Sequence, residues 1–325
     1  MRHGLLALVT GGLGLLVLGV PTQAATATAP TVVSLTFDGT FGSQELAAAI
    51  LSEHEMSGTF YVNSGYVDSP AHLSIGQLRT IGRGGHEIGG GSAYGNDLST
   101  LTVDDAQRQV CDDRATLAQL GFQVTSFAYP YGTGTARAKK VVQECGYNSA
   151  REFAGLYRSP TDCSSCPVAE TLPPTDDFRI RTSTDASVDR LKEQVRRAES
   201  GGAGWLPLTF TRVCTCSDAM AGTISPSDFV TFVTWLRARQ DTTVVRTVDQ
   251  VMGGPLKPVH GEPSDRLVPD PSPAISTPQA LSKAPAWTVL GIDVGQSQIL
   301  VLCVVVTFAI VVTFRLATKG QRHAL

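Results

Sequence analysis

Hydrophobic and polar positions follow two alternating patterns along residues 31–252. Short apolar runs, typical of buried strands, are each followed by a stretch with apolar positions three and four residues apart, as in an amphipathic helix. The pattern predicts strands at residues 32–38, 58–63, 86–90, 178–184, 205–210 and 243–248, and a strand followed by a turn at residues 126–132. It predicts helices at residues 42–54, 74–82, 136–145, 187–199 and 225–239, and a long helix that begins at Thr102. Strands alternating with helices favour parallel pairing through right-handed crossovers. We therefore expect one α/β domain closed into a barrel of about seven strands.

The first residues of the chain are apolar and precede this domain. Residues 1–24 combine a basic residue, Arg2, with an apolar run and end in the small-x-small sequence Thr-Gln-Ala. This combination is typical of a secretory signal peptide, with an uncleaved N-terminal anchor as the alternative.

The last residues are apolar as well. Residues 287–316 include 299–314, which carry no charge, and predict one transmembrane segment, with a buried C-terminal helix as the alternative. Residues 253–286 are rich in proline and predict an extended stalk. The tail, residues 317–325, is basic and contains no acidic side chain, so we expect it in the cytoplasm and the domain outside the cell.

Charge and cysteine content refine this picture. The chain has 29 acidic and 26 basic residues, so nothing in its composition indicates a nucleic-acid partner. Six of the seven cysteines lie outside the expected span, and an even number outside the cell predicts disulfides. These six are Cys111, Cys145, Cys163, Cys166, Cys214 and Cys216. We expect Cys111 to pair with Cys145, and the 163/166 pair to cross-link to the 214/216 pair. A structural zinc site made from the last four cysteines is the alternative.

The chemistry of a parallel barrel is expected where its strands end in loops. Asp38, Asn63, Gly91 and Tyr131 lie at or just beyond such ends. Three tyrosines, Tyr94, Tyr129 and Tyr131, are expected near the barrel mouth, where aromatic rings could stack on sugars or serve as core-edge residues.

At these strand ends the sequence resembles the polysaccharide deacetylase family, the NodB-homology or carbohydrate esterase 4 group. The matching segments, in family order, are SLTFDGT at 34–40, GTFYVNSG at 58–65, GHEIGGG at 85–91, FAYPYG at 127–132 and WLPLTF at 205–210. The resemblance covers residues 31–252 and implies an irregular (β/α)7-type barrel. It also implies metal-dependent removal of N-acetyl groups from glycans. In the family, one Asp and two His hold a divalent metal such as zinc, a second Asp is the base, and a late-strand His is the acid.

This chain departs from the family at most of those positions. The family's adjacent pair of Asp is Asp38-Gly39 here, so Asp38 is a remnant of either the base or the metal ligand. The two His positions are Gly91 and Gly95, and the late-strand His position is Thr211. Ala128 stands where the family motif has Arg. We therefore expect no cofactor, although a shifted site built from Asp38, His86 and Asp97 is conceivable. Asp97 is otherwise a turn residue or helix cap.

Together these features predict a membrane-anchored extracellular protein of the deacetylase fold whose hydrolytic site has degenerated. Its expected partner is a cell-surface or cell-wall glycan, which Tyr131, Tyr129, Tyr94 and Asp97 are candidates to contact. The alternative is an active hydrolase that removes N-acetyl groups from a surface polysaccharide with a rearranged site. A third hypothesis is a structural partner of another membrane protein, for which the GxxxG spacing of Gly291 and Gly295 is a weak indication.

Overall fold

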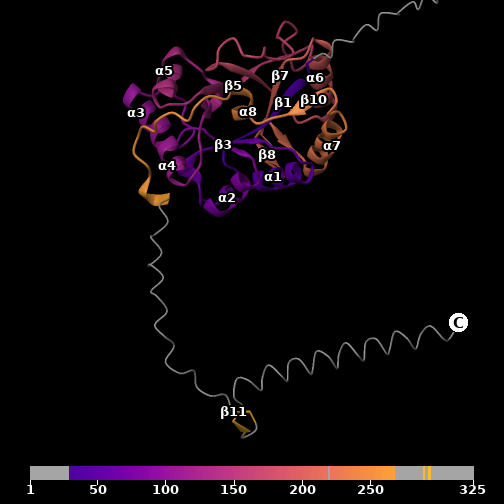
Figure 1. Ribbon diagram of the computed structural model, residues 1–325. Coiled ribbons are helices and arrows are strands. Elements are labelled where there is room, and N and C mark those ends of the chain that lie inside the picture. The colour runs from indigo at the N-terminus through magenta and orange to yellow at the C-terminus, as the bar shows by residue number, and fades with distance from the viewer. Residues whose placement is uncertain (1–28, 219, 268–287, 290–291, 294–325) are drawn as a thin grey trace, which may run out of the picture. The chain divides into compact units, whose positions relative to one another are not determined.

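Seven parallel strands form a closed barrel in chain order (Figure 1). The ring closes because β1 (Thr31–Asp38) pairs with both β2 (Thr59–Val62) and β7 (Trp205–Phe210). The other barrel strands are β3 (Glu87–Gly90), β4 (Ser126–Ala128), β5 (Ser149–Gly155) and β6 (Ile180–Thr184). The expected barrel is therefore confirmed.

The computed structural model describes residues 29–218 and 220–267, with the backbone of residues 288–289 and 292–293. Within these ranges, no helix has the length and apolar character needed to cross a membrane. The expected signal peptide, and almost all of the expected span and tail, lie outside the described residues. Residues 288–289 and 292–293 form a separate antiparallel pair, β11 and β12.

Helices surround the barrel (Figure 1). They are α1 (Gln44–Glu53), α2 (Ile75–Arg83), α3 (Val103–Gln107), α4 (Asp113–Gln119), α5 (Ala136–Glu144), α6 (Val188–Ser200), α7 (Pro226–Arg237) and α8 (Val248–Met252). Short 3₁₀ turns lie at η1 (Ser64–Tyr66), η3 (Pro130–Gly132) and η4 (Asp265–Leu267). The long helix expected from Thr102 is instead two α-helices joined by a π-helical turn, η2 (Arg108–Asp112).

Each barrel strand alternates between side chains that face the helices and side chains that face the interior. In β1, Val33, Leu35 and Phe37 belong to the large apolar cluster shared with the helices. Val32 belongs to a second, smaller cluster with Trp205 and Tyr61. This alternation directs the last residue of β1, Asp38, to the same side as Val32.

The predicted strands need correction at two places. β5 is absent from the prediction, because its sequence SAREFAG places two charged residues inside the strand and lacks an apolar run. The strand predicted at 243–248 is only β10 (Thr243–Val245), and α8 begins at Val248. β10 pairs with the first residues of β1 and is not one of the seven strands that close the ring.

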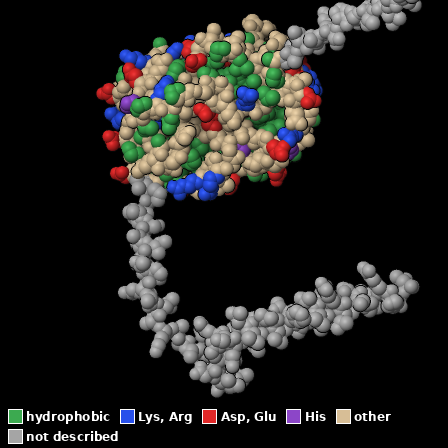
Figure 2. Space-filling view, in the orientation of Figure 1, with side chains coloured by type: hydrophobic (Ala, Val, Ile, Leu, Met, Phe, Trp, Pro, Cys, Tyr) green, Lys and Arg blue, Asp and Glu red, His purple; other side chains and the backbone are tan. Residues whose placement is uncertain are grey.

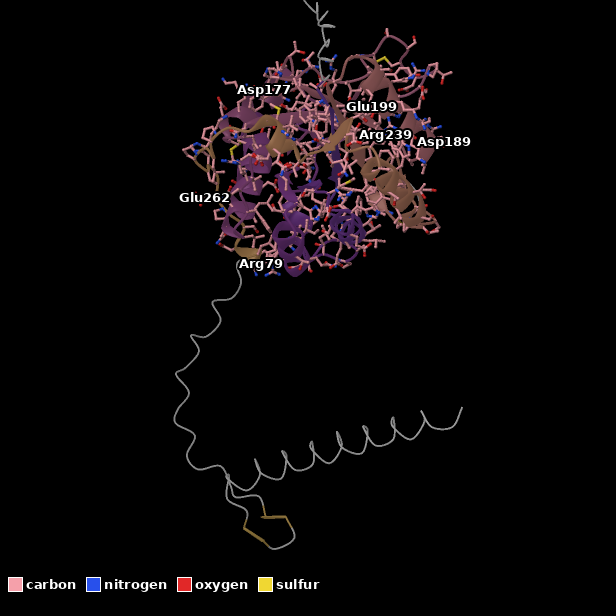
Figure 3. The ribbon with its side chains drawn as sticks, turned by 45° about the vertical axis from the view of Figure 1, so that its right-hand side comes forward. Arg79, Asp177, Asp189, Glu199, Arg239 and Glu262 are labelled. Carbon is pink, nitrogen blue, oxygen red and sulfur yellow. A yellow bond between two sulfur atoms is a disulfide. The ribbon has the colours of Figure 1, made fainter. Side chains whose placement is uncertain are left out.

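Glu199 and Arg239 join the end of α6 to β10 (Figure 3). The carboxylate of Glu199 accepts hydrogen bonds from Arg239 Nε at 3.2 Å and from Thr243 Oγ1 at 2.7 Å. One carboxylate thus fixes the turn after α7 and the start of β10 to the same helix.

Three disulfides join the six cysteines that the structure describes. Cys111–Cys145 is confirmed, and it links η2 to the residue that follows α5. The expected cross-links between the other two cysteine pairs are wrong, since Cys163 bonds to Cys166 and Cys214 to Cys216. In both local pairs the Cα atoms are 5.4 Å apart, a separation that a disulfide spans without moving the backbone. Because all four sulfur atoms are bonded, the alternative of a zinc site is also wrong.

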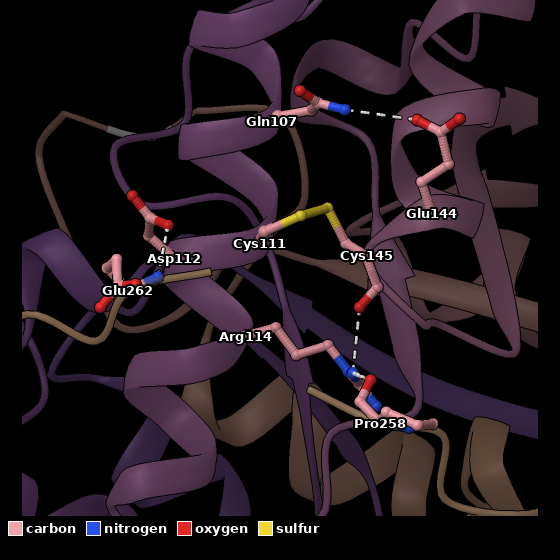
Figure 4. The surroundings of a disulfide bond; sticks show 8 residues. All are labelled: Gln107, Cys111, Asp112, Arg114, Glu144, Cys145, Pro258 and Glu262. Carbon is pink, nitrogen blue, oxygen red and sulfur yellow. Dashed lines mark hydrogen bonds between the residues drawn. A yellow bond between two sulfur atoms is a disulfide. The ribbon is translucent and has the colours of Figure 1, made fainter. Parts of the chain in front are cut away.

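Residues 253–267 pack on the barrel domain, so the stalk boundary predicted at 253 lies too early. The buried guanidinium of Arg114 donates to the carbonyls of Lys257 and Pro258 on this segment, at 3.0 and 2.8 Å. It also donates to the carbonyl of Cys145 at 3.0 Å, beside the Cys111–Cys145 disulfide (Figure 4). Further along, Glu262 N donates to Asp112. The segment is therefore a strap across η2 and α4.

Candidate functional site

A cavity of about 460 Å³ opens at the carboxyl ends of the barrel strands. Its lining consists mostly of aromatic and small side chains with a few polar groups. The lining residues are Asp38, Gly39, Phe41, Tyr61, Asn63, Gly91, Gly95, Ala128, Tyr129, Pro130, Tyr131, Phe153, Thr211, Met220 and Ala221. The strand ends that the sequence indicated, at Asp38, Asn63, Gly91 and Tyr131, therefore do meet around one cavity.

The carboxylate on the floor of the cavity is paired with a buried guanidinium that is not itself part of the lining. Asp38 forms an ion pair with Arg151, whose side chain is 1% exposed, whereas that of Asp38 is 24% exposed. The guanidinium carbon of Arg151 lies 4.5 Å from the centre of the Tyr61 ring. Burial raises the pKa of Asp38, and the charge and hydrogen bond of Arg151 oppose that rise. The hydroxyl of Tyr61 is buried without a hydrogen-bond partner in the described part of the chain.

Arg151 is the functional residue that sequence reasoning missed. It lies on β5, and its register partner on β4 is Ala128, the position where the family motif has Arg. An arginine is thus present one strand away from the position where the motif would place it. The signal that could have located it is a pair of charged residues, Arg151 and Glu152, inside a segment as short as the other strands.

The glycines at the two family His positions lie beside Asn63. The Asn63 side-chain amide donates to the carbonyls of Gly91 at 2.6 Å and Ser92 at 2.8 Å. A Cβ atom placed on Gly91 would lie 3.0 Å from Asn63 Nδ2. Asn63 therefore occupies the space into which a larger side chain at 91 would project.

The late-strand position is also without an acid. Thr211 Oγ1 donates a hydrogen bond to the carbonyl of Ala221 at 2.9 Å. The Thr211 carbonyl accepts a hydrogen bond from Gln44, which also donates to the carbonyl of Asp38. These bonds fix the ends of β7 and β1 relative to each other, and Thr211 offers no group that could protonate a leaving amine near neutral pH.

The residues at the cavity do not fit a divalent metal. Glycines at 91 and 95 supply no side-chain donor, and the only carboxylate that lines the cavity, Asp38, is already paired with Arg151. Across residues 29–218 and 220–267, no three His, Cys, Asp or Glu side chains are grouped so that they could hold a metal ion.

The conceivable shifted site is not assembled. His86 precedes β3 and therefore lies at the opposite end of the barrel from Asp38. Its ring contacts Ser52 Oγ at 3.0 Å and accepts a hydrogen bond from Gly58 N at 3.1 Å. Asp97 accepts a hydrogen bond from Ser99 N at 2.9 Å, which is the turn role that was its alternative.

The three candidate tyrosines differ in position. Tyr131 lines the cavity and is 79% exposed, with a φ of 57° in the left-handed region. Tyr129 also lines the cavity, but it is 2% exposed and its hydroxyl donates to the carbonyl of Phe178 at 3.1 Å. Tyr94 is not among the lining residues, and its ring meets that of Tyr66 edge-on. Of the three, Tyr131 is the ring that a ligand could reach most easily.

A buried carboxylate supports the loop that follows β2. Asp113 is fully buried and accepts a hydrogen bond from Ser64 N at 2.8 Å, next to Asn63. Burial raises the pKa of Asp113 to about 7, although the hydrogen bond from Ser64 opposes this rise. The folded protein therefore retains a proton on Asp113 at pH values where the unfolded chain has lost it.

This proton makes stability depend on pH. Between the ordinary aspartate pKa near 4 and a folded pKa of about 7, the folded state binds the extra proton, so stability falls as pH rises. From pH 5 to pH 7 we expect Asp113 to lower the free energy of unfolding by about 2 kcal/mol. Asp113→Asn should remove this part of the pH dependence of the free energy of unfolding, measured by urea denaturation at each pH. Asp104→Asn on the surface of α3 should leave that pH dependence unchanged. The same pH dependence of stability in the wild type and in Asp113→Asn would contradict the raised pKa of Asp113.

The charges on the face shown in Figure 2 do not indicate a strongly charged partner. Figure 2 shows acidic and basic side chains intermingled over the visible face of the barrel domain. This distribution agrees with the net charge of −3. A cavity lined mainly by aromatic and small side chains on such a surface is better suited to a neutral ligand than to a polyanion.

Comparisons with known proteins show a similarity over the first half of the barrel domain. The polysaccharide deacetylase family model matches residues 25–150, which run from before β1 into β5. No curated protein matches the chain. The chain is similar to the solved structure of the Streptococcus pyogenes deacetylase PplD in complex with acetate. The two are 20% identical with a TM-score of 0.41, and the match covers 50% of this chain and 69% of PplD.

Two further similar structures come from bacilli. The peptidoglycan deacetylase PdaC from Bacillus subtilis is 16% identical with a TM-score of 0.43, covering 68% of this chain and 90% of that one. BA3943 from Bacillus anthracis, described as a CE4 family pseudoenzyme, is 14% identical with a TM-score of 0.44, covering 69% of this chain and 66% of that one. The match over residues 25–150 makes this part of the chain similar to the polysaccharide deacetylase family.

Proposed function

We propose that this protein is a non-catalytic glycan-binding member of the family, secreted and held at the cell membrane by its C-terminal segment. The observation that carries the proposal is the composition of the cavity. The positions that hold the metal and the acid in the family are Gly91, Gly95 and Thr211, while the aromatic walls around them remain. This lining lacks the groups that hydrolysis needs in the family, and its aromatic walls are of a kind on which sugar rings stack.

Tyr131 supports the binding half of this proposal. A non-glycine residue in the left-handed region costs on the order of 1 kcal/mol or more, and such residues cluster at functional sites. Here that conformation keeps a large ring exposed on the rim of the cavity. Membrane attachment and an extracellular location rest on the sequence of residues 1–24 and 287–325.

Titration of the full-length protein with N-acetylglucosamine oligomers tests the function. We expect saturable binding, with Tyr131→Ala weakening the affinity about tenfold through loss of a stacking contact worth about 1.4 kcal/mol. Tyr131→Phe, which keeps the ring, should bind as the wild type does. Tyr131 is exposed, so the denaturation midpoint of both variants should stay close to that of the wild type. Wild-type affinity in Tyr131→Ala would contradict the proposal for this ring.

The alternative of an active hydrolase is favoured by one observation, the carboxylate of Asp38 retained at the cavity floor. Acetate release from the same oligomers distinguishes the two functions. The non-catalytic function predicts no acetate with zinc, cobalt, nickel or chelator present. Metal-dependent acetate release that Asp38→Ala abolishes would establish the alternative.

A further inference from the structure

The one carboxylate on the cavity floor already has a cation, and the chain itself supplies it. Arg151 reaches from β5 to Asp38 at the end of β1, strands that are not neighbours in the sheet. A guanidinium carries a permanent positive charge in a planar group suited to a carboxylate. The charge that a bound metal ion would bring to Asp38 is thus present without one.

The guanidinium is held firmly in this position. Its side chain is 1% exposed, one face lies 4.5 Å from the centre of the Tyr61 ring, and Nη1 donates to the carbonyl of Glu152 at 3.3 Å. Tyr61 is itself the register partner of Asp38 on the neighbouring strand. Strands β1, β2 and β5 therefore all contribute to the surroundings of Arg151.

The opposite side of the cavity offers a metal ion no charged side chain. Gly91 and Gly95 present no donor, and Asn63 commits its side-chain amide to the carbonyls of Gly91 and Ser92. A metal ion would have to displace Arg151 and would gain one carboxylate. Structural and catalytic zinc sites use three or four protein ligands.

We propose that Arg151 is the resident cation of this site, and that the cavity therefore binds its ligand without a divalent metal. With Asp38 neutralised, the floor presents a carboxylate oxygen to the hydroxyl and amide groups of an uncharged sugar. The nature of the ligand rests on the proposed function. The role of Arg151 does not, because it concerns only the residues of the cavity floor.

Calorimetric titration of zinc, cobalt and nickel tests the role of Arg151 directly. The full-length chain is used without an affinity tag, and Asp38→Asn is the matched variant with the carboxylate removed. We expect the wild-type and Asp38→Asn titrations to coincide, and dialysis against a chelator to leave the denaturation midpoint unchanged. One-to-one binding in the wild type that Asp38→Asn abolishes would overturn the inference.

Titration with N-acetylglucosamine oligomers separates this inference from the proposed function. We expect the same affinity with chelator and with zinc, and Arg151→Lys, which keeps a cation beside Asp38, to bind within a few-fold of the wild type. A glycan affinity that requires zinc would overturn the inference and leave glycan binding intact. Absence of glycan binding together with coincident metal titrations would overturn the proposed function and support the role of Arg151.

Discussion

Replacing Arg151 with methionine should lower the free energy of unfolding by about 3–5 kcal/mol, the range found when one partner of a buried ion pair is removed. Methionine fills similar space, but it leaves the carboxylate of Asp38 on the cavity floor without a cation. Chemical denaturation at pH 7.5 measures the loss. A cost below about 1 kcal/mol, the median for exposed ion pairs, would show that the pair is solvated and that Asp38 needs no partner.

The double variant Asp38→Asn/Arg151→Met separates charge from packing. It removes both charges, so it should be more stable than Arg151→Met alone even though it carries one more substitution. The stability lost in Arg151→Met should also depend on pH. In Arg151→Met the opposing effect of the guanidinium on the Asp38 pKa is gone, so the folded state holds a proton there to higher pH. The difference in unfolding free energy between the wild type and Arg151→Met should therefore become smaller as pH falls from 7.5 to 5.

The barrel could be predicted because apolar side chains alternate along most of its strands. Val33, Leu35 and Phe37 face the helices, and this apolar alternation is visible in the sequence. β5 does not follow it. Arg151 faces Asp38, while Glu152 binds Arg179 on the surface, so the strand shows two charges where a buried strand normally shows none. A strand whose inward side chain is stabilised by a partner 113 residues away cannot be recognised from its own sequence.

The candidate site was predictable to the same extent. Strand ends meet at one rim of a parallel barrel, so Asp38, Gly91 and Tyr131 could be placed together from strand order alone. Tyr94 and Asp97 lie on the loop between β3 and α3, whose path depends on local bonds such as that from Ser99 N to Asp97. Sequence position brought both residues near the cavity, but these local contacts, Tyr94 against Tyr66 and Asp97 within its own turn, keep them off its lining.

Removing the Cys111–Cys145 disulfide should also lower the free energy of unfolding by a large amount. The bond closes a loop with a sequence separation of 34 residues, and the chain-entropy relation gives about 4 kcal/mol for a loop of that length. Cys163–Cys166 closes a loop with a separation of 3, for which the same relation gives about 2 kcal/mol. Paired alanine substitutions provide matched variants, since each removes one disulfide and leaves no free thiol.

The Cys111–Cys145 bond also lies against the strap, so its removal should affect that segment as well as the loop that the bond closes. Gly261 of the strap packs on the backbone of Cys111, and Arg114 links the carbonyl of Cys145 to the strap. Cys111→Ala/Cys145→Ala should therefore lower the free energy of unfolding more than Cys163→Ala/Cys166→Ala does, and raise amide hydrogen exchange in residues 257–264. Cys163→Ala/Cys166→Ala should leave exchange in that segment unchanged. Equal stability losses in the two variants would contradict the dependence on loop length, and unchanged exchange in Cys111→Ala/Cys145→Ala would show that Arg114 holds the strap without the disulfide.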